Sequence, residues 1–506
     1  MTTWTSGYVA DIGYTYGYYA ELNPQRVRLA FLNAGLAFPD MGTACELGFG
    51  QGLSANLHAA GSVCSWWGTD FNPAQADFAR ELAHASGSGA QLFDESFAEF
   101  AAREMPEFDY IGVHGIWSWV SDANRAVIVD FIRRKLKVGG VLYISYNTLP
   151  GWGTFAPMRH LMTEHAEVLG STGRGIVSRI NDAIDFTERL LATNPIYARA
   201  NPQVAERLQK LKEHNRHYLA HEYFNRDWHP MHFATMAQWL EPAKVQFACS
   251  AHTIDHLDAL NLSADQQKFL SEIPATMLRQ TVRDFMVNQQ FRKDYWVKGQ
   301  RRLSPYEQSR LIQETSVVLT TPREDIPFKI NTILGEATLS EGVYGPLLQV
   351  LSDYNPRTLG ELQATEPNLS RVKEVALVLM GAGHLALAQD PQAIKQAALG
   401  VAALNRHLCN KAQGSADISF LASAVTGGGV PVNRFEQLFL RELTQGQQDP
   451  RQWAAATWAL LKAQGQRLIK EGKTLEADAD NLAELGSLAT AFESKRLPML
   501  RRLRVV

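Results

Sequence analysis

The chain has few cysteines, and no two of them lie close together in the sequence. Cys45, Cys64, Cys249 and Cys409 are its four cysteines, spread over 506 residues. None has a second cysteine at the distance typical of a zinc site or a redox-active pair. This scarcity argues against a secreted fold held together by disulfides, and it predicts a cytoplasmic protein in a reducing environment.

Long apolar runs and an excess of one charge are also missing. No stretch approaches the roughly 18 apolar residues of a membrane-spanning helix. The N-terminus, MTTWTSGYVADIGYTYGYY, has neither the basic start nor the apolar core of a signal peptide. A formal net charge of -3 offers no general attraction to nucleic acid or to an anionic membrane. We therefore expect neither nucleic acid nor membrane as a partner.

The chain does have length and a regular alternation of strand-like and helix-like segments. Its 506 residues exceed one ordinary core, so about three domains are expected. Helix-forming segments separate five strand-like segments, which are 43–47, 65–70, 90–94, 108–115 and 140–147. This alternation predicts an α/β fold: a Rossmann-like, mostly parallel sheet with helices on both faces.

The rhythm changes after this core, which suggests further units. Two later strand candidates, 247–254 and 293–299, would complete a seven-stranded sheet. The predicted units are an aromatic leader or lid with a first helix (1–40), a nucleotide-binding core (41–155), a helical insertion with a regulatory or dimerisation role (156–240), the closing strands (241–305), and a mainly helical, winged-helix-like C-terminal region (325–506).

The winged-helix pattern raises the question of DNA binding. A helix–helix–strand order lies between residues 344 and 388, and modules of this kind usually bind DNA through a basic face. Residues 337–390 carry six acidic groups against three basic ones. Because this balance is opposite to that of a phosphate-binding face, we interpret the unit as a packing or dimerisation module. A homodimer is expected.

The segment CELGFGQG (45–52) follows the first strand and suggests a nucleotide cradle. A dinucleotide fingerprint would need a third glycine at position 53, where the chain has leucine. Instead an acidic residue precedes three alternate glycines; these four residues are Glu46, Gly48, Gly50 and Gly52. Glycines allow close approach of a ligand, and the helix N-terminus offers free N–H groups to an anion. The pattern resembles motif I of S-adenosylmethionine (SAM) methyltransferases; an NAD site or a plain turn is the alternative.

The next strand ends carry groups that SAM would require. Asp70 ends the second strand, where its carboxylate could accept hydrogen bonds from both ribose hydroxyls, and Phe71 could stack on adenine. The third strand ends at Glu95, Ser96 and Phe97, the adenine-reading position in most proteins of this kind. Whether Glu95 or Ser96 reads adenine stays open.

The leader contains an unusual cluster of tyrosines. The segment GYTYGYY (13–19) holds four tyrosines and two glycines. We predict a lid over bound SAM, with Tyr16 and Tyr18 as cofactor contacts, since aromatic rings exclude water and their hydroxyls bind polar edges. The alternative is an arm packed in a dimer interface.

Three more segments carry a family resemblance. The segments are FDYIGVHGIWSWV (108–120), VLYISYNTLPGW (141–152) and YLAHEYFN (218–225). Together they resemble bacterial protein-lysine methyltransferases with a methyltransferase regulatory domain. The best-known members modify outer-membrane surface antigens. The resemblance extends from the leader to about residue 300, and it implies SAM as cofactor and a protein substrate, such as a surface or outer-membrane protein before export. The family usually has tyrosine where this chain has Trp117, and its leader is shorter, so fold and cofactor carry over better than substrate.

Methyl transfer to an amine needs a nitrogen lone pair aligned with the methyl group, and a dry pocket with aromatic walls favours it. At the fourth strand end, His114 could contact the cofactor, polarise the nucleophile or simply pack under Trp117. Trp117 and Trp119 could wall the amine channel, and one of the two is expected only to pack. At the fifth strand end, Tyr146 and Asn147 are the other catalytic candidates.

Two further readings complete the expectations. The histidine-rich segment 214–232 lacks the H-E-x-x-H zinc pattern, because position 225 is asparagine, so no metal is expected. This segment could instead border the active-site mouth through His221 and Glu222. Small-molecule or peptide N-methylation, or a non-catalytic SAM-binding scaffold, are the alternatives to protein-lysine methylation.

Overall fold

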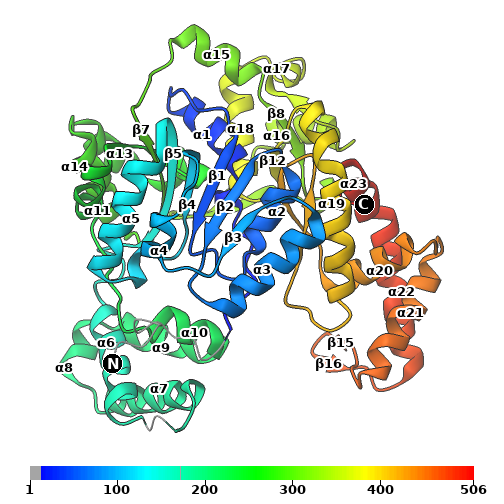
Figure 1. The fold of residues 1–506 in the computed structure, drawn as a ribbon, viewed down its shortest axis with the longest axis horizontal. Helices are drawn as coiled ribbons and strands as arrows, with labels where there is room; N and C mark the ends of the chain where they lie inside the picture. The colour runs from blue at the N-terminus through cyan, green and yellow to red at the C-terminus, as the bar shows by residue number, and fades with distance from the viewer. Residues whose placement is uncertain (1–12, 171–172) are drawn as a thin grey trace.

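The computed structural model describes residues 13–170 and 173–506. Its centre is a seven-stranded sheet with strand order β3-β2-β1-β4-β5-β7-β6 (Figure 1). In chain order the strands are β1 (Thr43–Leu47), β2 (Ser65–Thr69), β3 (Gln91–Phe93), β4 (Phe108–Val113), β5 (Leu136–Asn147), β6 (Val245–Ser250) and β7 (Phe291–Lys298). Only β7 runs antiparallel to its neighbours, β5 and β6. The predicted α/β fold with a Rossmann-like, mostly parallel sheet is confirmed.

Helices cover both faces of the sheet, because its central strands carry apolar side chains on both sides. One face packs against α1 (Val27–Asn33), α2 (Leu53–Gly61) and α3 (Pro73–Ser86). The other packs against α4 (Phe97–Ala102), α5 (Asp122–Lys135) and α11 (Phe233–Leu240). Local sequence sets the helix ends: the Asn72 side chain caps α3, and Gly87 ends it in the left-handed conformation.

The described residues between β5 and α11 form a block of helices in the predicted insertion. They are α6 (Ala156–Val168), α7 (Ile176–Ala192), α8 (Ile196–Ala200), α9 (Gln203–Glu213) and α10 (Arg216–Tyr223). These helices enclose an apolar core of their own. In Figure 1 they lie below the sheet, facing the carboxyl ends of its parallel strands. Between β6 and β7 the chain adds three further α-helices, α12 (Asp258–Asn261), α13 (Ala264–Ser271) and α14 (Thr276–Met286).

The C-terminal region begins with a three-stranded sheet of order β11-β8-β12. Its elements are α15 (Pro305–Gln313), β8 (Ser316–Leu319), the hairpin β9 (Lys329–Thr332) and β10 (Gly335–Thr338), α16 (Glu341–Leu351), β11 (Arg357–Thr358), α17 (Leu359–Leu362), α18 (Leu369–Gly381) and β12 (Leu385–Leu387). Helices and a strand thus follow one another between residues 344 and 388. The sequence predicts that this region is mainly helical, and the structure adds more short strands than this prediction suggested.

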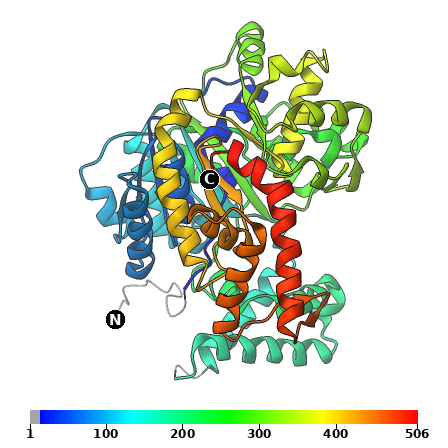
Figure 2. The same ribbon diagram turned by 90° about the vertical axis from the view of Figure 1, so that its right-hand side faces the viewer.

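Residues 391–506 form a last unit, which we call the C-terminal module. It comprises α19 (Pro391–Lys411), β13 (Phe420–Ser423), β14 (Gly428–Pro431), α20 (Arg434–Thr444), α21 (Pro450–Ala463), β15 (Ile469–Lys470), β16 (Lys473–Thr474), α22 (Asp478–Ala491) and α23 (Leu497–Arg502). Helix α19 runs beside α2 and α3 (Figure 2). Leu57 of α2 and Leu82 of α3 share a buried cluster with Val401 and Leu404 of α19. The module therefore packs directly on the helix that follows the glycine-rich turn.

No helix in the described part of the chain is both long enough and apolar enough to cross a membrane.

Candidate active site

A cavity of about 500 Å³ lies at the carboxyl ends of the parallel strands. Its wall combines the leader, the turn after β1, the ends of β2 to β5, and helix α10 of the insertion. This volume falls within the usual range for small-molecule sites, roughly 300–1,000 Å³. A larger groove of about 1250 Å³ runs beside the edge strand β6, but its lining includes none of the site residues predicted from the sequence. The smaller cavity is therefore the candidate site.

The glycine-rich turn forms one wall of this cavity. Gly48, Gly50 and Gly52 all adopt the left-handed conformation, with φ of +72°, +58° and +69°. A Cβ atom at Gly48 would lie 2.5 Å from the Ile116 side chain, and one at Gly52 would lie 2.5 Å from Cβ of Ala79. The backbone can therefore follow this path only where side chains are absent.

Two buried carboxyl groups face each other beside the turn. Asp70 accepts hydrogen bonds from the backbone N–H groups of Gly50 (2.9 Å) and Asn72 (3.0 Å). Burial raises the pKa of Asp70 to about 7. Burial, and then the charge of Asp70, raises the pKa of Glu46 to about 8. The Oε2 atom of Glu46 is buried without a hydrogen-bond partner among the described residues. An acceptor left in this state suits a ligand that brings its own donors.

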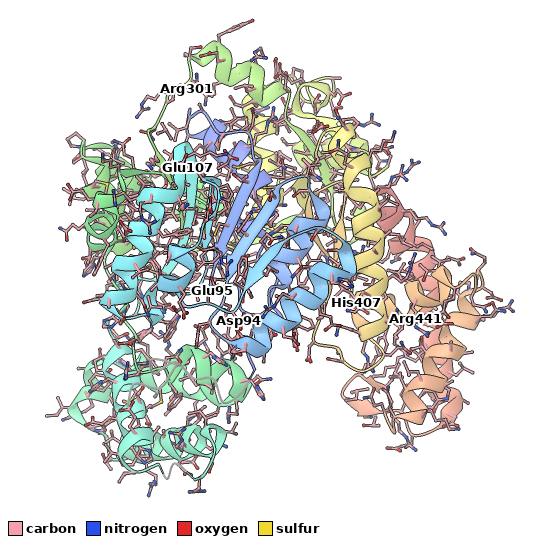
Figure 3. All side chains as sticks on the ribbon, viewed as in Figure 1. Asp94, Glu95, Glu107, Arg301, His407 and Arg441 are labelled. Carbon is pink, nitrogen blue, oxygen red and sulfur yellow. The ribbon has the colours of Figure 1, made fainter. Side chains whose placement is uncertain are left out.

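The third strand end lines the same cavity through Phe71, Glu95, Ser96 and Phe97. Glu95 lies at the lower edge of the sheet in Figure 3, and its Oε2 accepts a hydrogen bond from Nε of Arg103 (3.1 Å). Ser96 caps α4, where its hydroxyl accepts the N–H of Glu99 and donates to the Glu99 carboxylate. The Ser96 hydroxyl is thus engaged with Glu99, and both carboxylate oxygens of Glu95 are engaged with Arg103, so the structure does not decide which of the two would read adenine.

The leader contributes different tyrosines from those predicted. Tyr14 and Tyr19 line the cavity, whereas Tyr16 and Tyr18 lie outside it. The Tyr16 ring contacts Phe78 edge-on at 5.0 Å. The Tyr18 ring lies 4.9 Å from Phe420 of β13 and 5.5 Å from His58 of α2. Both rings pack against the apolar cluster that includes the C-terminal module, and they therefore point away from the cavity.

His114 follows β4 and lines the cavity. Its ring contacts that of Tyr19 with centroids 3.8 Å apart and a tilt of 32°, and its Nδ1 lies 2.7 Å from the Tyr143 hydroxyl. Burial lowers the pKa of His114 to about 3, so the imidazole is neutral at physiological pH. A neutral, hydrogen-bonded ring can orient a neighbour but is a weak proton acceptor.

Of the remaining catalytic candidates, the structure brings only Asn147 into the cavity. Trp117 is fully buried below it, and its indole N–H points to the Met231 sulfur at 3.3 Å. Trp119, two residues later, lines the cavity instead. The Tyr146 hydroxyl donates to Asp294 of β7 at 2.9 Å. Because neighbouring side chains of a strand point to opposite faces, Tyr146 is directed into the protein and Asn147 to the site.

Helix α10 closes the cavity opposite the glycine turn. Glu222 accepts a hydrogen bond from the Tyr14 hydroxyl at 3.0 Å, and the Tyr14 ring meets His221 edge-on at 4.9 Å. Burial raises the pKa of Glu222 to about 7, although the Tyr14 hydrogen bond opposes this rise. Four other lining residues of this region were not singled out from the sequence: Trp152, Arg207, Tyr218 and Asp227. Trp152 and Tyr218 belong to segments that carry the family resemblance, whereas no motif marks Arg207 or Asp227.

Within residues 13–170 and 173–506, no three histidine, cysteine or acidic side chains come together as a possible metal site. The histidines of the segment 214–232 serve other contacts: Nδ1 of His217, for example, lies 3.2 Å from the Gly13 carbonyl oxygen.

Comparisons with known proteins agree with this geometry. Residues 45–144 match the family model described as a methyltransferase domain, and residues 215–298 match the predicted methyltransferase regulatory domain. The chain is 41% identical over 510 residues to an uncharacterised protein of Synechocystis sp. (sll1526), covering 99% of both chains. A second relative, RP789 of Rickettsia prowazekii, is 26% identical over 54% of this chain and 49% of its own.

A solved structure shares the fold over almost the whole chain. PKMT2 of Rickettsia typhi in complex with AdoHcy superimposes with a TM-score of 0.68 at 15% identity, covering 96% of this chain and 98% of that one. At this identity the likeness establishes a common fold. The helical insertion and the C-terminal region are therefore part of that shared architecture.

Proposed function

Because this chain belongs to the family of SAM-dependent methyltransferases that carry a methyltransferase regulatory domain, we propose that it methylates an amine, and that this amine is a lysine side chain of a protein. SAM is the methyl donor. The open question is therefore the acceptor. The charges and aromatic rings of the cavity support the choice of an amine.

The residues present fit the cofactor. The orphaned oxygen of Glu46 and the glycine turn would hold its amino-acid and ribose portions, Asp70 would accept from the ribose hydroxyls, and Glu95 or Ser96 would face adenine. When bound, SAM supplies a methyl group carried on a positively charged sulfur. The chain itself orients the two reactants and excludes water from between them.

The single observation that carries the proposal is an excess of carboxylates in the cavity. Five acidic side chains line it against one guanidinium; they are Glu46, Asp70, Glu95, Glu222 and Asp227, and the guanidinium belongs to Arg207. The cofactor would engage the first three. Glu222 and Asp227 remain, beside the rings of Tyr14, Tyr218 and Trp152. Carboxylates and aromatic faces attract an ammonium ion, and they disfavour a phosphate or carboxylate acceptor.

The choice of protein lysine over a small amine follows the regulatory domain and the fold shared with PKMT2. We extend the proposal to a surface or outer-membrane protein methylated in the cytoplasm before export, and to a homodimeric enzyme. The exposed apolar side chains of α13 and α14, such as Phe269, Leu278 and Phe285, support a surface that contacts another protein.

The proposal is tested by labelling. The enzyme is incubated with SAM bearing a labelled methyl group and a heat-inactivated bacterial protein extract, and the protein is then hydrolysed to amino acids. We expect the label in methyl-lysine. Acetylating the lysines of the extract beforehand should abolish it. Label found only in small molecules, or in base-labile methyl esters, contradicts the proposal.

A cofactor-site variant serves as the matched control. Asp70→Ala removes the proposed acceptor for the ribose hydroxyls. Since a hydrogen bond to a charged group contributes roughly 1.5–3 kcal/mol, cofactor affinity should fall about 10- to 100-fold. Calorimetric titration with S-adenosylhomocysteine (SAH) measures this loss directly. Unchanged affinity would contradict the placement of the adenosyl group.

A further inference from the structure

Glu222 is an acidic side chain of the cavity that a tyrosine of the leader holds in place. It belongs to α10, within the regulatory domain, and it is half-buried in the cavity wall. The Tyr14 hydroxyl donates to its Oε1 at 3.0 Å. Gln51, from the glycine turn, donates its side-chain amide to the Tyr14 carbonyl oxygen at 3.3 Å. The position of Glu222 is thus tied to the turn that would hold the cofactor.

Tyr19 connects Glu222 with the sheet edge. Burial raises the pKa of Tyr19, while a hydrogen bond with Tyr14 lowers it and the charges of Glu222 and Glu46 raise it. The charges of both carboxyl groups therefore act on the Tyr19 hydroxyl. The Tyr19 ring contacts His114 at a tilt of 32°, at the end of β4 where this fold presents groups to the acceptor. Glu46, Glu222 and Tyr19 line the same cavity, and this is where an acceptor nitrogen would meet the methyl group.

We propose that Glu222 accepts the proton that the acceptor ammonium must lose before methyl transfer. The inference rests on the proposed function, in that it assumes an amine acceptor. The ammonium gives one proton to the carboxylate and becomes a neutral amine. The nitrogen lone pair then forms the N–C bond as the C–S bond breaks, and that electron pair stays on sulfur, leaving a neutral thioether and a methylated ammonium. The carboxylic acid of Glu222 finally returns its proton to solvent.

The surroundings of Glu222 suit this role. Its pKa of about 7 lies near the operating pH, where a proton acceptor is most effective. The other candidates are less suitable, because His114 stays neutral with a pKa near 3 and Tyr146 lies outside the cavity. The titratable and charged groups that face this end of the cavity are Tyr14 and Tyr19 of the leader, Arg207 of α9, Tyr218, His221 and Tyr223 of α10, Asp227, and Glu46 across the cavity.

The test replaces the carboxylate by its isosteric amide. Glu222→Gln should lower the rate of methyl-lysine formation in the heat-inactivated extract by about 100- to 10,000-fold at pH 7. Its SAH affinity should stay within about threefold of wild type. The variant rate should rise steadily toward pH 10, because the lysine then loses its proton to solvent. Glu213→Gln, at the exposed end of α9, is the matched control and should behave as wild type.

A second variant tests the same idea if the first is unstable. Tyr14→Phe removes the hydrogen bond that lowers the pKa of Glu222, so the acidic limb of the rate–pH profile should move to higher pH. An unmoved limb overturns the proposal, as does a Glu222→Gln variant that keeps its rate or loses SAH affinity tenfold or more. Wild-type enzyme that labels no lysine instead overturns the proposed function, and this is seen before any variant is compared.

Discussion

At the glycine-rich turn, two demands fall on the same residue. Gly52 must adopt a left-handed conformation, with φ of +69°, and must also leave room for Ala79 of α3. The first demand concerns the backbone alone, and the second concerns packing between α2 and α3. A glycine that meets only the first demand exists in the same helix pair: Gly87 has φ of +65°, and a Cβ there would meet no described atom within 4 Å.

These two glycines give a matched prediction. Gly87→Ala should cost about 1–2 kcal/mol of unfolding free energy, the usual penalty of the left-handed region. Gly52→Ala should cost about 1–3 kcal/mol more, because its Cβ would lie 2.5 Å from Cβ of Ala79. Urea unfolding measures both, and SAH titration should show weakened binding for Gly52→Ala only. Equal losses in the two variants would show that α3 moves aside freely.

Sequence reasoning at the residue scale succeeded where the signal is local. The glycine motif, Glu46 and Asp70 follow directly from strand ends and turn spacing. The structure places Glu46, Asp70, Gly48 and Gly50 around one cavity, whereas Gly52 does not line it and lies against Ala79. The sequence could not show which of Trp117 and Trp119, and which of Tyr146 and Asn147, faces the cavity. The direction of these side chains is set by contacts with Met231 and Asp294, which lie far along the chain.

At the scale of elements, the leader links the C-terminal module to the cavity. Tyr18 packs between His58 of α2 and Phe420 of β13, while Tyr14 and Tyr19 on either side of it line the cavity. The glycines of β14 make room for this ring, since a Cβ at Gly428 would lie 2.6 Å from its hydroxyl oxygen. The leader, for which the sequence predicts a lid, is therefore held in position by a distant hairpin.

This anchoring predicts an effect at a distance. Tyr18→Ala should weaken SAH binding by about tenfold, equivalent to about 1.4 kcal/mol, although Tyr18 does not line the cavity. The reason is that the ordered position of Tyr14 and Tyr19 loses its support. Titration calorimetry checks this, and Tyr306→Ala, whose ring is 78% exposed on α15, is the control. Binding equal to wild type would show that the leader is held without Tyr18.

The elements themselves were predictable to different degrees. The buried strands of the sheet stand out as short apolar runs, and their alternation with helices predicts that most of them run parallel. The start of β5 was not predictable, because Leu136 to Gly139 resemble a helix end followed by a glycine stop. In the structure these residues extend the strand. The docking of α19 on α2 was also beyond prediction, since both helices simply present apolar faces.

At the scale of the whole molecule, titration of the cavity links stability to cofactor binding. Glu46, Asp70 and Glu222 have pKa values raised to about 8, 7 and 7 by burial. Each therefore binds its proton more tightly in the folded than in the unfolded chain. The stability they contribute is present below their unfolded pKa and is lost as pH rises through the folded values. Buried His58 and His114, with pKa values lowered to about 3, act in the opposite sense, but only below about pH 6.5.

The thermal midpoint of the ligand-free protein should therefore fall between about pH 6.5 and 8.5, where buried carboxyl groups with raised pKa values, these three and Asp294 among them, lose their protons. Ribose hydroxyls and a ligand ammonium favour the ionised carboxylates of Glu46 and Asp70, so bound SAH should lower their pKa values and remove much of this fall. The difference between the midpoints of the complex and of the free protein should widen with pH, as scanning calorimetry at constant ionic strength would record. Glu46→Gln should flatten the dependence of the free protein. A difference that narrows with pH would mean that the cofactor binds the protonated cavity, and that Glu46 and Asp70 do not hold it as ionised acceptors.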